Sequence, residues 1–188
     1  MPPKAKITKE MIIDTAFCIA QHEGMDKVTA RSISEQLNCS TQPVLYYFAT
    51  VEEIKKEVYK KSDEFHTIFI MNMERDYGNP MLAIGMNYIR FAIEERNLFR
   101  LLFQSNEFSQ VSLLDLLEME DIKPILAVLQ NELDMSMEET KDIFATLFIF
   151  VHGYASLYAN NTMVFDETNV MMSLEKVFYG AICAAKGE

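Results

Sequence analysis

The residue types and spacing best suited to chemistry occur between positions 29 and 48, where two short helical patterns are joined by a tight link. Thr29 and Ser40 precede the two patterns as N-cap residues, and Asn38-Cys39 separates them. This spacing is typical of a helix-turn-helix, whose second helix enters the major groove of DNA. The residues that the second helix would present to DNA are Ser40, Thr41, Gln42, Tyr46 and Tyr47.

The chemistry of these side chains suits the recognition of bases and phosphates. A glutamine can pair with adenine in the major groove, and hydroxyl groups can bind phosphates or bases. An ordinary solvent-exposed first turn of a helix would carry the same residues. Their spacing alone therefore leaves both interpretations open.

No other group of residues indicates catalysis or a bound cofactor. The sequence has no paired carboxylates beside a base, no Ser/His/Asp or Cys/His grouping and no glycine-rich phosphate loop. The histidines His22, His66 and His152 are dispersed and predict no metal site. We therefore expect neither an enzyme nor a protein with a cofactor or metal.

The cysteines form no CxxC pattern, and we expect reduced thiols in the core at Cys18, Cys39 and Cys183.

The elements that must position these residues are predicted to be helices throughout. Apolar residues recur at three- and four-residue spacing along the 188-residue chain, and its 6 glycines and 5 prolines fall between the periodic segments. We predict an all-α fold of about nine or ten helices. Capping boxes mark two helix starts, at Thr50 and Ser136, and Asn79-Pro80 marks a third. The expected ranges are about 8–23, 29–38, 40–48, 50–73, 80–94, 96–104, 110–119, 122–133, 137–160 and 167–185.

The N-terminus and the apolar segments indicate where in the cell the protein is located. The sequence MPPKAKITKE leads into amphipathic sequence without an apolar signal region. The longest strongly apolar segment is too short to span a bilayer. These features predict a cytoplasmic protein without a membrane partner.

The net charge of −11 argues against a non-specific nucleic-acid coat, but the charge is divided unevenly. Residues 1–61 hold nine basic and eight acidic residues, so the acidic excess lies in the remainder of the chain. Lys4, Lys6 and Lys9 precede the first acidic residue and fit either a basic arm along DNA or a solubilising tail. This distribution of charge predicts a protein that binds selected DNA sequences and has a weak, salt-dependent affinity for other DNA.

The stretch EGMDKVTARSISEQLNCSTQPVLYYFATVEEI resembles the DNA-binding domain of the TetR family of bacterial transcriptional regulators over its whole length. The resemblance extends from about Thr8 to Ile54. It implies an N-terminal three-helix helix-turn-helix domain at 1–50 and a C-terminal helical bundle for dimerisation and ligand binding at 51–188, with a connecting helix at about 51–73. The residues that match the family pattern are Ala16, Gly24, Thr29, Arg31, Ile33, Leu37, Ser40, Val44, Tyr47, Phe48 and Glu52-Glu53-Ile54.

By this resemblance the second of the two short helices is the recognition helix, and Phe48 packs inward to hold it. Two positions depart from the family pattern. Leu45 replaces a usual Tyr and removes a phosphate-binding hydroxyl, and Val51 replaces a usual Lys, for which Lys55 or Lys56 can substitute. The operator sequence therefore does not follow from the resemblance. The expected DNA-binding residues are Thr29, Arg31, Ser40, Thr41, Gln42, Tyr46, Tyr47 and Lys55.

The segment IFATLFIFVHGYASLY contains no charged side chain, so the helix that it predicts must be buried on more than one side. The last helix is also largely apolar, and its small residues allow close packing. We infer a homodimer built on a four-helix bundle of these two helices, as the resemblance also implies. Such a dimer spaces two recognition helices about one DNA turn (~34 Å) apart and predicts a palindromic operator in double-stranded DNA. The expected interface residues are Ile143, Leu147, Phe150, Tyr154, Val170, Leu174, Phe178, Ala181 and Ile182.

Methionine and phenylalanine stripes lie between the first domain and these two helices. Such stripes usually form core, but unbranched side chains also line adaptable pockets for apolar ligands. The resemblance implies an effector cavity here, and we expect an apolar or cationic small molecule. His152-Gly153 fits either a core histidine beside a close-packing glycine or a ligand contact. The expected pocket residues are Phe65, Phe69, Met86, Phe103, Leu117, Phe144, Phe148 and His152.

The resemblance implies a sequence-specific transcriptional regulator, foremost a repressor that a small-molecule ligand releases from its operator. An activator, or a regulator controlled by a protein partner, fits the same sequence. The alternative from a different class is a helical interaction protein without a role on DNA. Salt-sensitive, sequence-selective binding to a palindromic operator would distinguish any of these transcriptional regulators from the helical interaction protein.

Overall fold

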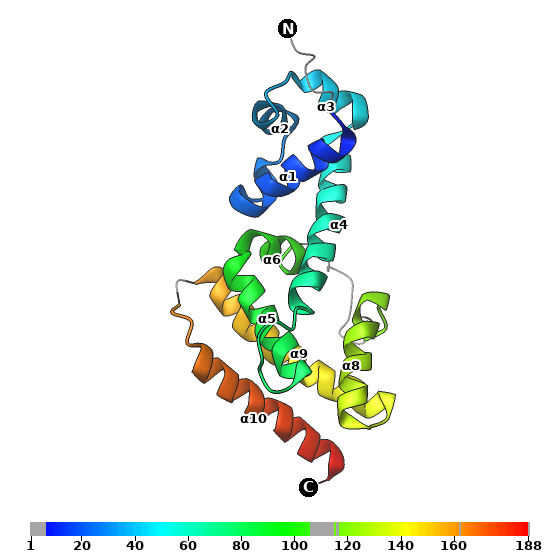
Figure 1. Ribbon diagram of the computed structural model, residues 1–188, viewed down its shortest axis with the longest axis vertical. Coiled ribbons are helices and arrows are strands. Elements are labelled where there is room, and N and C mark those ends of the chain that lie inside the picture. The colour runs from blue at the N-terminus through cyan, green and yellow to red at the C-terminus, as the bar shows by residue number, and fades with distance from the viewer. Residues whose placement is uncertain (1–6, 106–114, 116, 162, 188) are drawn as a thin grey trace. The chain divides into compact units, whose positions relative to one another are not determined.

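The computed structural model describes residues 7–105, 115, 117–161 and 163–187, and these residues form helices and no strand (Figure 1). The all-α prediction is confirmed. Within the described residues there are nine α-helices and two short 3-10 helices (η), whereas the predicted helix at 110–119 lies mostly outside them. The bounds are α1 Lys9–Glu23, η1 Met25–Lys27, α2 Ala30–Gln36, α3 Thr41–Tyr47, α4 Val51–Ile70, α5 Pro80–Glu94, α6 Arg96–Phe103, η3 Glu120–Ile122, α8 Lys123–Leu133, α9 Met137–Asn160 and α10 Glu167–Lys186.

Side-chain caps explain where α1 and α9 begin. The hydroxyl of Thr8 accepts a hydrogen bond from the Met11 N–H at 3.2 Å. Ser136 and Glu139 form a capping box at the start of α9, in which each side chain bonds the other residue's backbone N–H. Such caps satisfy N–H groups that have no partner inside the helix. Both helices therefore begin where the sequence predicts.

A buried asparagine joins the end of α4 to α5. The amide of Asn87 donates to the carbonyl oxygens of Ile70 and Asn72 at 3.2 and 2.6 Å. These bonds satisfy carbonyl groups at the end of α4, which stops at Ile70 rather than near residue 73 as predicted. Asn79 then caps α5, of which Pro80 is the first residue, and this start is as predicted.

The first compact unit comprises Met1–Thr67 and Glu95–Glu107, and it contains α1, α2, α3, most of α4 and α6. Gln21 joins α1 to α6. Its amide donates to both carboxylate oxygens of Glu95 at 3.0 and 2.9 Å, and its carbonyl accepts from the Asn97 amide at 2.9 Å. The unit thus includes helices beyond residue 50, while a functional boundary at that residue stays a prediction. Its fully buried apolar side chains include Ile12, Ala16, Ile33, Val44, Val58, Leu98 and Phe99.

The second compact unit comprises Ile68–Glu94 and Phe108–Glu188, and α5 is its most deeply buried helix. Every residue from 81 to 89 is buried, and α5 contacts α8, α9 and α10 (Figure 1). At Gly85 an added Cβ would lie 2.9 Å from Leu174 of α10 and 3.3 Å from Val151 of α9. The missing side chain at this position therefore allows the close packing of three helices.

Glu167, the first residue of α10, holds the segment before α5. The hydroxyl of Tyr77 donates to its carboxylate at 2.6 Å, and the guanidinium groups of Arg75 and Arg90 lie 3.6 and 3.7 Å from the same oxygen. Partial burial and the nearby Glu167 carboxylate raise the pKa of Tyr77 to about 12. The phenol therefore stays protonated and keeps donating its hydrogen bond at neutral pH.

The expectation of core thiols is wrong. Cys18 on α1 and Cys183 on α10 are exposed, and Cys39 is half-buried. The buried face of α1 is built from Ile12 and Ala16 and does not include the position of Cys18. A small thiol tolerates either environment, so its residue type alone does not place it.

Candidate DNA-binding surface

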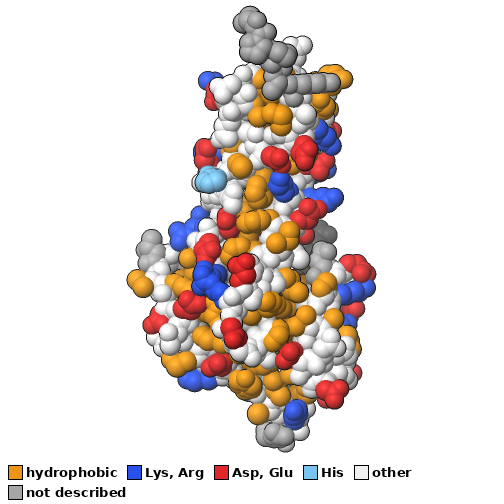
Figure 2. All heavy atoms as spheres, in the orientation of Figure 1, with side chains coloured by type: hydrophobic (Ala, Val, Ile, Leu, Met, Phe, Trp, Pro, Cys, Tyr) orange, Lys and Arg blue, Asp and Glu red, His pale blue; other side chains and the backbone are white. Residues whose placement is uncertain are grey.

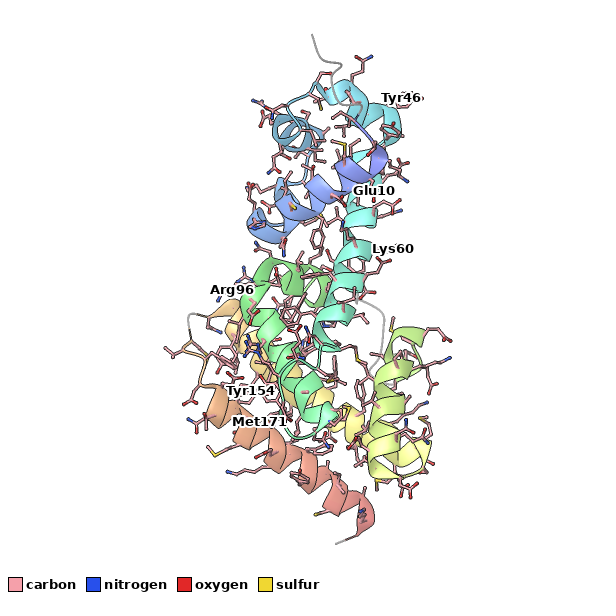
Figure 3. All side chains as sticks on the ribbon, viewed as in Figure 1. Glu10, Tyr46, Lys60, Arg96, Tyr154 and Met171 are labelled. Carbon is pink, nitrogen blue, oxygen red and sulfur yellow. The ribbon has the colours of Figure 1, made fainter. Side chains whose placement is uncertain are left out.

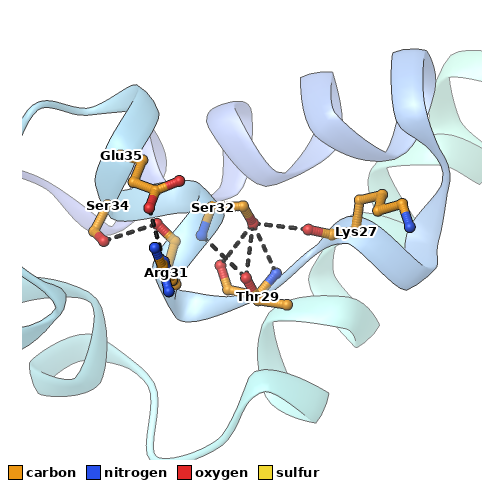
Figure 4. Close-up of polar contacts among 6 residues, drawn as sticks. All are labelled: Lys27, Thr29, Arg31, Ser32, Ser34 and Glu35. Carbon is orange, nitrogen blue, oxygen red and sulfur yellow. Dashed lines mark hydrogen bonds and ion pairs between the residues drawn. The ribbon is translucent and has the colours of Figure 1, made fainter.

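Thr29 opens α2 through a network that uses its hydroxyl group (Figure 4). The Ser32 N–H donates to the Thr29 hydroxyl oxygen at 3.0 Å, and the Thr29 N–H donates to the Ser32 hydroxyl oxygen at 3.0 Å. The Ser32 hydroxyl in turn donates to the Lys27 carbonyl at 2.7 Å. Thr29 is confirmed as the N-cap, and Ser32 is a residue that the sequence analysis missed. The partner position of a capping box usually holds Glu or Gln, so a serine there gives only a weak signal.

Arg31 projects from the first turn of α2 and is paired with an acidic neighbour (Figure 4). Its Nε lies 2.8 Å from Glu35 Oε1, one turn further along the helix, and both side chains are largely exposed. An exposed pair of this spacing is weak and exchangeable. Arg31 is thus able to reach a phosphate or a base, but Glu35 competes for its charge in the free protein.

The link between α2 and α3 turns at Asn38, whose φ of 50° lies in the left-handed region. Asn adopts this conformation more readily than other non-glycine residues. The Cys39 N–H donates to the Ser34 carbonyl at 3.0 Å and closes the turn. The predicted helix-turn-helix connection is therefore present with a tight, hydrogen-bonded geometry.

One face of α3 is buried and the opposite face is exposed. Val44 is fully buried and Phe48 is 3% exposed, so Phe48 packs inward as expected. Tyr46 lies on the outer side of the helix and is 81% exposed (Figure 3). Leu45, which replaces the family's usual Tyr, is 53% exposed on the same side. The exposed residues of α3 are Thr41, Gln42, Leu45 and Tyr46.

The ends of α3 carry two further predicted contacts. Ser40 is the N-cap by backbone geometry, but its side chain makes no capping hydrogen bond, so its hydroxyl is available to another acceptor or donor. Tyr47 is half-buried and its ring packs edge-on against Tyr46 at a centroid distance of 5.2 Å. Seven of the eight predicted DNA-binding residues therefore lie on or directly before α2 and α3 in one compact unit.

The eighth predicted residue, Lys55, lies on α4 and is half-buried beside Glu52, with the charged atoms 4.0 Å apart. It borders an open groove of about 830 Å³ that is lined by the end of α1, by η1, by the start of α4 and by α6. Lys56 borders the same groove and is exposed.

Lys9 does not extend from the protein as an arm, because its ammonium lies 3.1 Å from Glu57 and 5.1 Å from the ring centre of Phe48. Lys4 and Lys6 lie outside the described residues.

Most residues predicted for the dimer interface are buried within the single chain. Ile143 and Leu147 of α9 are 1% and 5% exposed, because they face the protomer's own helices. Val170, Leu174 and Phe178 of α10 are at most 2% exposed. The other four predicted residues are half-buried: Phe150, Tyr154, Ala181 and Ile182.

Other apolar residues of α9 and α10 are exposed, and the sequence analysis did not single them out. Ile149, Gly153 and Leu157 repeat every four residues on α9, so they share one face. On α10, Met172 and Tyr179 are 45% and 54% exposed. The visible surface of the second unit shows apolar side chains in several patches (Figure 2). We name Ile149, Gly153, Leu157, Met172, Tyr179 and Gly180 the apolar face of α9 and α10.

The residues predicted for an effector pocket do not all belong to one unit. Phe65 and Phe103 lie in the first unit, where Phe103 packs against His66 at 5.0 Å between ring centres. The other six lie in the second unit, and three of these, Met86, Leu117 and Phe144, are buried.

Within the second unit an aromatic cluster joins α5 and α9. Phe144, Phe148 and His152 are spaced four residues apart on α9, with neighbouring ring centres 6.1 and 5.5 Å apart. The hydroxyl of Tyr88 on α5 lies at hydrogen-bond distance, 2.9 Å, from His152 Nδ1. Burial lowers the pKa of His152, so the ring is neutral at pH 7. This cluster therefore presents uncharged aromatic rings.

The described residues give no indication of a metal site and only weak evidence for a membrane span. Among residues 7–105, 115, 117–161 and 163–187, no group of three or more His, Cys, Asp or Glu side chains is placed to hold a metal ion. Helix α9 is long and apolar enough to cross a membrane. Core helices of soluble proteins also meet that criterion, and α9 packs against α5, α8 and α10. The length and composition of α9 are thus weak evidence for a membrane span.

A capped helix, a hydrogen-bonded turn and a second helix with one buried and one exposed face define a helix-turn-helix protein. Comparison with known proteins narrows this class. Residues 81–177 match the family described as tetracyclin repressor-like, C-terminal domain. This match covers just over half of the 188-residue chain. The chain therefore belongs to the TetR family.

One curated relative is also similar. The uncharacterized HTH-type transcriptional regulator YobS of Bacillus subtilis (strain 168) is 27% identical over 96 residues, which is half of each chain. The chain thus spans about half the length of the curated relative that it matches.

Proposed function

We propose that this protein is a sequence-specific DNA-binding transcriptional regulator of the cytoplasm, acting as a repressor that a small-molecule effector releases from DNA. The observation that carries the proposal is the exposed side of α3, where Thr41, Gln42 and Tyr46 lie directly after a hydrogen-bonded turn. Exposed amide and hydroxyl groups on such a helix match base edges and phosphates. Membership of the TetR family supports the same role.

The experiment is the selection of binding sites from a randomised DNA library with the purified protein. We expect a palindromic site, bound with an affinity that falls steeply as salt rises. Thr41→Ala and Tyr47→Phe should each weaken binding several-fold while the far-UV circular dichroism stays unchanged. Thr168→Ala, an exposed threonine of α10, is the matched control and should bind normally. Full binding by both variants would remove α3 from the role of recognition helix.

The second part of the proposal is a homodimer through the apolar face of α9 and α10. Ile149 and Leu157 are 59% and 49% exposed in the single chain, although the segment of α9 around them contains no charged side chain. An added Cβ at Gly153 or Gly180 meets no atom within 4 Å, so a helix of a partner has room to approach closely there. A two-fold dimer would bury this surface and pair two recognition helices with two half-sites.

The third part is an apolar cationic effector that binds at the aromatic cluster of α5 and α9. Neutral aromatic rings attract a cation through their π faces, whereas a charged His152 would repel it. Tetraphenylphosphonium is a suitable probe, and tetraphenylborate is its control with the same shape and the opposite charge. We expect only the cation to weaken operator binding, and Phe148→Ala to abolish this response. Equal effects of both ions would contradict a cation-selective site.

A further inference from the structure

The exposed face of α3 has an apolar centre. A helix advances about 100° per residue, so Gln42 and Leu45 lie about 60° apart, with Thr41 and Tyr46 at the two edges of the exposed face. Val44 on the opposite side is fully buried. Leu45 therefore occupies the middle of the surface that α3 would present to a major groove, and it is 53% exposed there.

An aliphatic side chain at this position favours one base over the others. In the major groove only thymine presents a methyl group, while the other base edges present hydrogen-bond donors and acceptors. Leu45 can bury a methyl group favourably, but it would cover a donor or acceptor without replacing its hydrogen bond to water. The side chain thus favours thymine and disfavours the remaining bases at the position it covers.

Gln42 adds a second, complementary preference. It is exposed, it precedes Leu45 by one helical turn on the same face, and its amide makes no hydrogen bond to any part of the chain that the structure describes. A glutamine amide matches the N6 and N7 groups of adenine. The two residues are about 4.5 Å apart along the helix axis, close to the ~3.4 Å spacing of stacked bases.

We propose that Gln42 and Leu45 are specificity-determining residues that read an adenine and a neighbouring thymine methyl in each operator half-site. This inference rests on the proposed DNA-binding function and makes it more specific. It predicts adjacent A·T base pairs at the centre of each half-site, where Leu45 discriminates by the methyl group and not by base pairing.

The test replaces each thymine of the selected operator by deoxyuridine, which removes the 5-methyl group and leaves the base pair intact. One thymine in each half-site should be sensitive, and the substitution should weaken binding about fourfold, as expected for the burial of one methyl-sized group. Leu45→Ala should bind the thymine and uracil operators equally, because the partner of the methyl is gone. Leu45→Met keeps an apolar side chain of similar size and should retain the sensitivity.

Two controls make the assignment specific. Thr41→Ala should bind more weakly overall yet keep the preference for thymine over uracil. Replacing the neighbouring adenine by 7-deaza-adenine removes the N7 acceptor, and it should weaken binding by the wild type about tenfold but leave Gln42→Ala unaffected. Circular dichroism of Leu45→Ala and Gln42→Ala should match the wild type, since both side chains are exposed.

The outcomes separate this inference from the proposed function. A selected palindrome in which no thymine methyl affects binding would overturn the inference and leave the regulator intact. The same holds if Leu45→Ala keeps the full sensitivity to uracil. Failure to select any sequence at low salt would instead overturn the proposed function, and the inference with it.

Discussion

Glu35 forms an ion pair with Arg31, one of the residues that we propose to bind DNA. The two lie on consecutive turns of α2, and the Arg31 guanidinium is bonded to the Glu35 carboxylate at 2.8 Å. In a DNA complex the Glu35 carboxylate would repel the phosphates. It would also neutralise part of the positive charge of Arg31 that attracts them. The pair is exposed, so its effect is small and depends on salt.

Glu35→Gln should therefore strengthen operator binding about threefold at low salt, because it removes a repulsive charge and releases Arg31. The effect should shrink as salt rises. Fluorescence anisotropy at two salt concentrations measures both. Glu138→Gln, an exposed acid in the first turn of α9, changes the net charge equally and should leave binding unchanged. Unchanged affinity in Glu35→Gln would mean that Glu35 does not weaken the binding of DNA.

His66 makes the stability of the first unit depend on pH. Burial lowers the pKa of His66 to about 4, whereas a histidine in the unfolded chain has a pKa near 6.5. Between these two values the unfolded chain binds more protons, so stability is lost as pH falls through this window. Burial also lowers the pKa of His152, which acts in the same direction.

The free energy of unfolding should fall by about 2 kcal/mol between pH 7 and pH 5 through His66. Urea unfolding at pH 7, 6 and 5 measures this slope. His66→Gln should flatten it, while His22→Gln, an exposed position on α1, should keep it. A slope that survives unchanged in His66→Gln would show that buried His66 is not its source.

At the level of helices, the position of α5 depends on one glycine. Gly85 brings α5 close to α9 and α10, and the nearest side chain, Leu174, is 1% exposed. Leu174 therefore has little room to move away from an added methyl group. The close packing of α5, α9 and α10 at this point therefore depends on the absence of a side chain at Gly85.

Gly85→Ala should lower the free energy of unfolding by about 1–2 kcal/mol, because overpacking outweighs the better helix propensity of alanine. Gly153→Ala is the control in α9, where an added Cβ meets no atom of the protomer. At low protein concentration it should gain about 0.5–1 kcal/mol. Thermal unfolding compares the two. A gain in stability for Gly85→Ala would mean that α5 is packed less tightly than the structure shows.

At the level of the whole molecule, the proposed function depends on association of two chains, each with one proposed DNA-binding surface. The segment 1–61 is nearly balanced in charge, and the chain as a whole carries −11. We therefore expect weak non-specific attraction to DNA, so that the proposed regulator would need two recognition helices on one operator for useful affinity.

Leu157→Glu should yield monomers that keep their helical content and bind the operator at least tenfold more weakly, since a buried charge in the interface is costly. Met137→Glu makes the same kind of change at an exposed apolar position in the first turn of α9, and it should stay dimeric. Sedimentation equilibrium distinguishes the two. A dimeric Leu157→Glu variant would exclude the apolar face of α9 and α10 as the interface.

The sequence predicts much of the local structure because local structure depends on near neighbours. Thr29 as a cap, Phe48 as an inward residue, and the bounds of α5 and α9 all follow from spacing within a few residues. The Arg31–Glu35 pair is also visible in the spacing of four residues, although it was not predicted. The exposure of Leu45 required the structure, since its own residue type predicts burial.

The helical class, the helix-turn-helix and its capping residues are encoded in the order of the residues, because each depends on interactions within one or two helical turns. Which apolar face packs inside the chain depends on distant elements. Ile143 and Ile149 lie on the same apolar helix, yet contact with α5, α8 and α10 buries the first and leaves the second exposed. Burial against the protomer and burial against a partner require the same apolar residues, so only the tertiary structure distinguishes them.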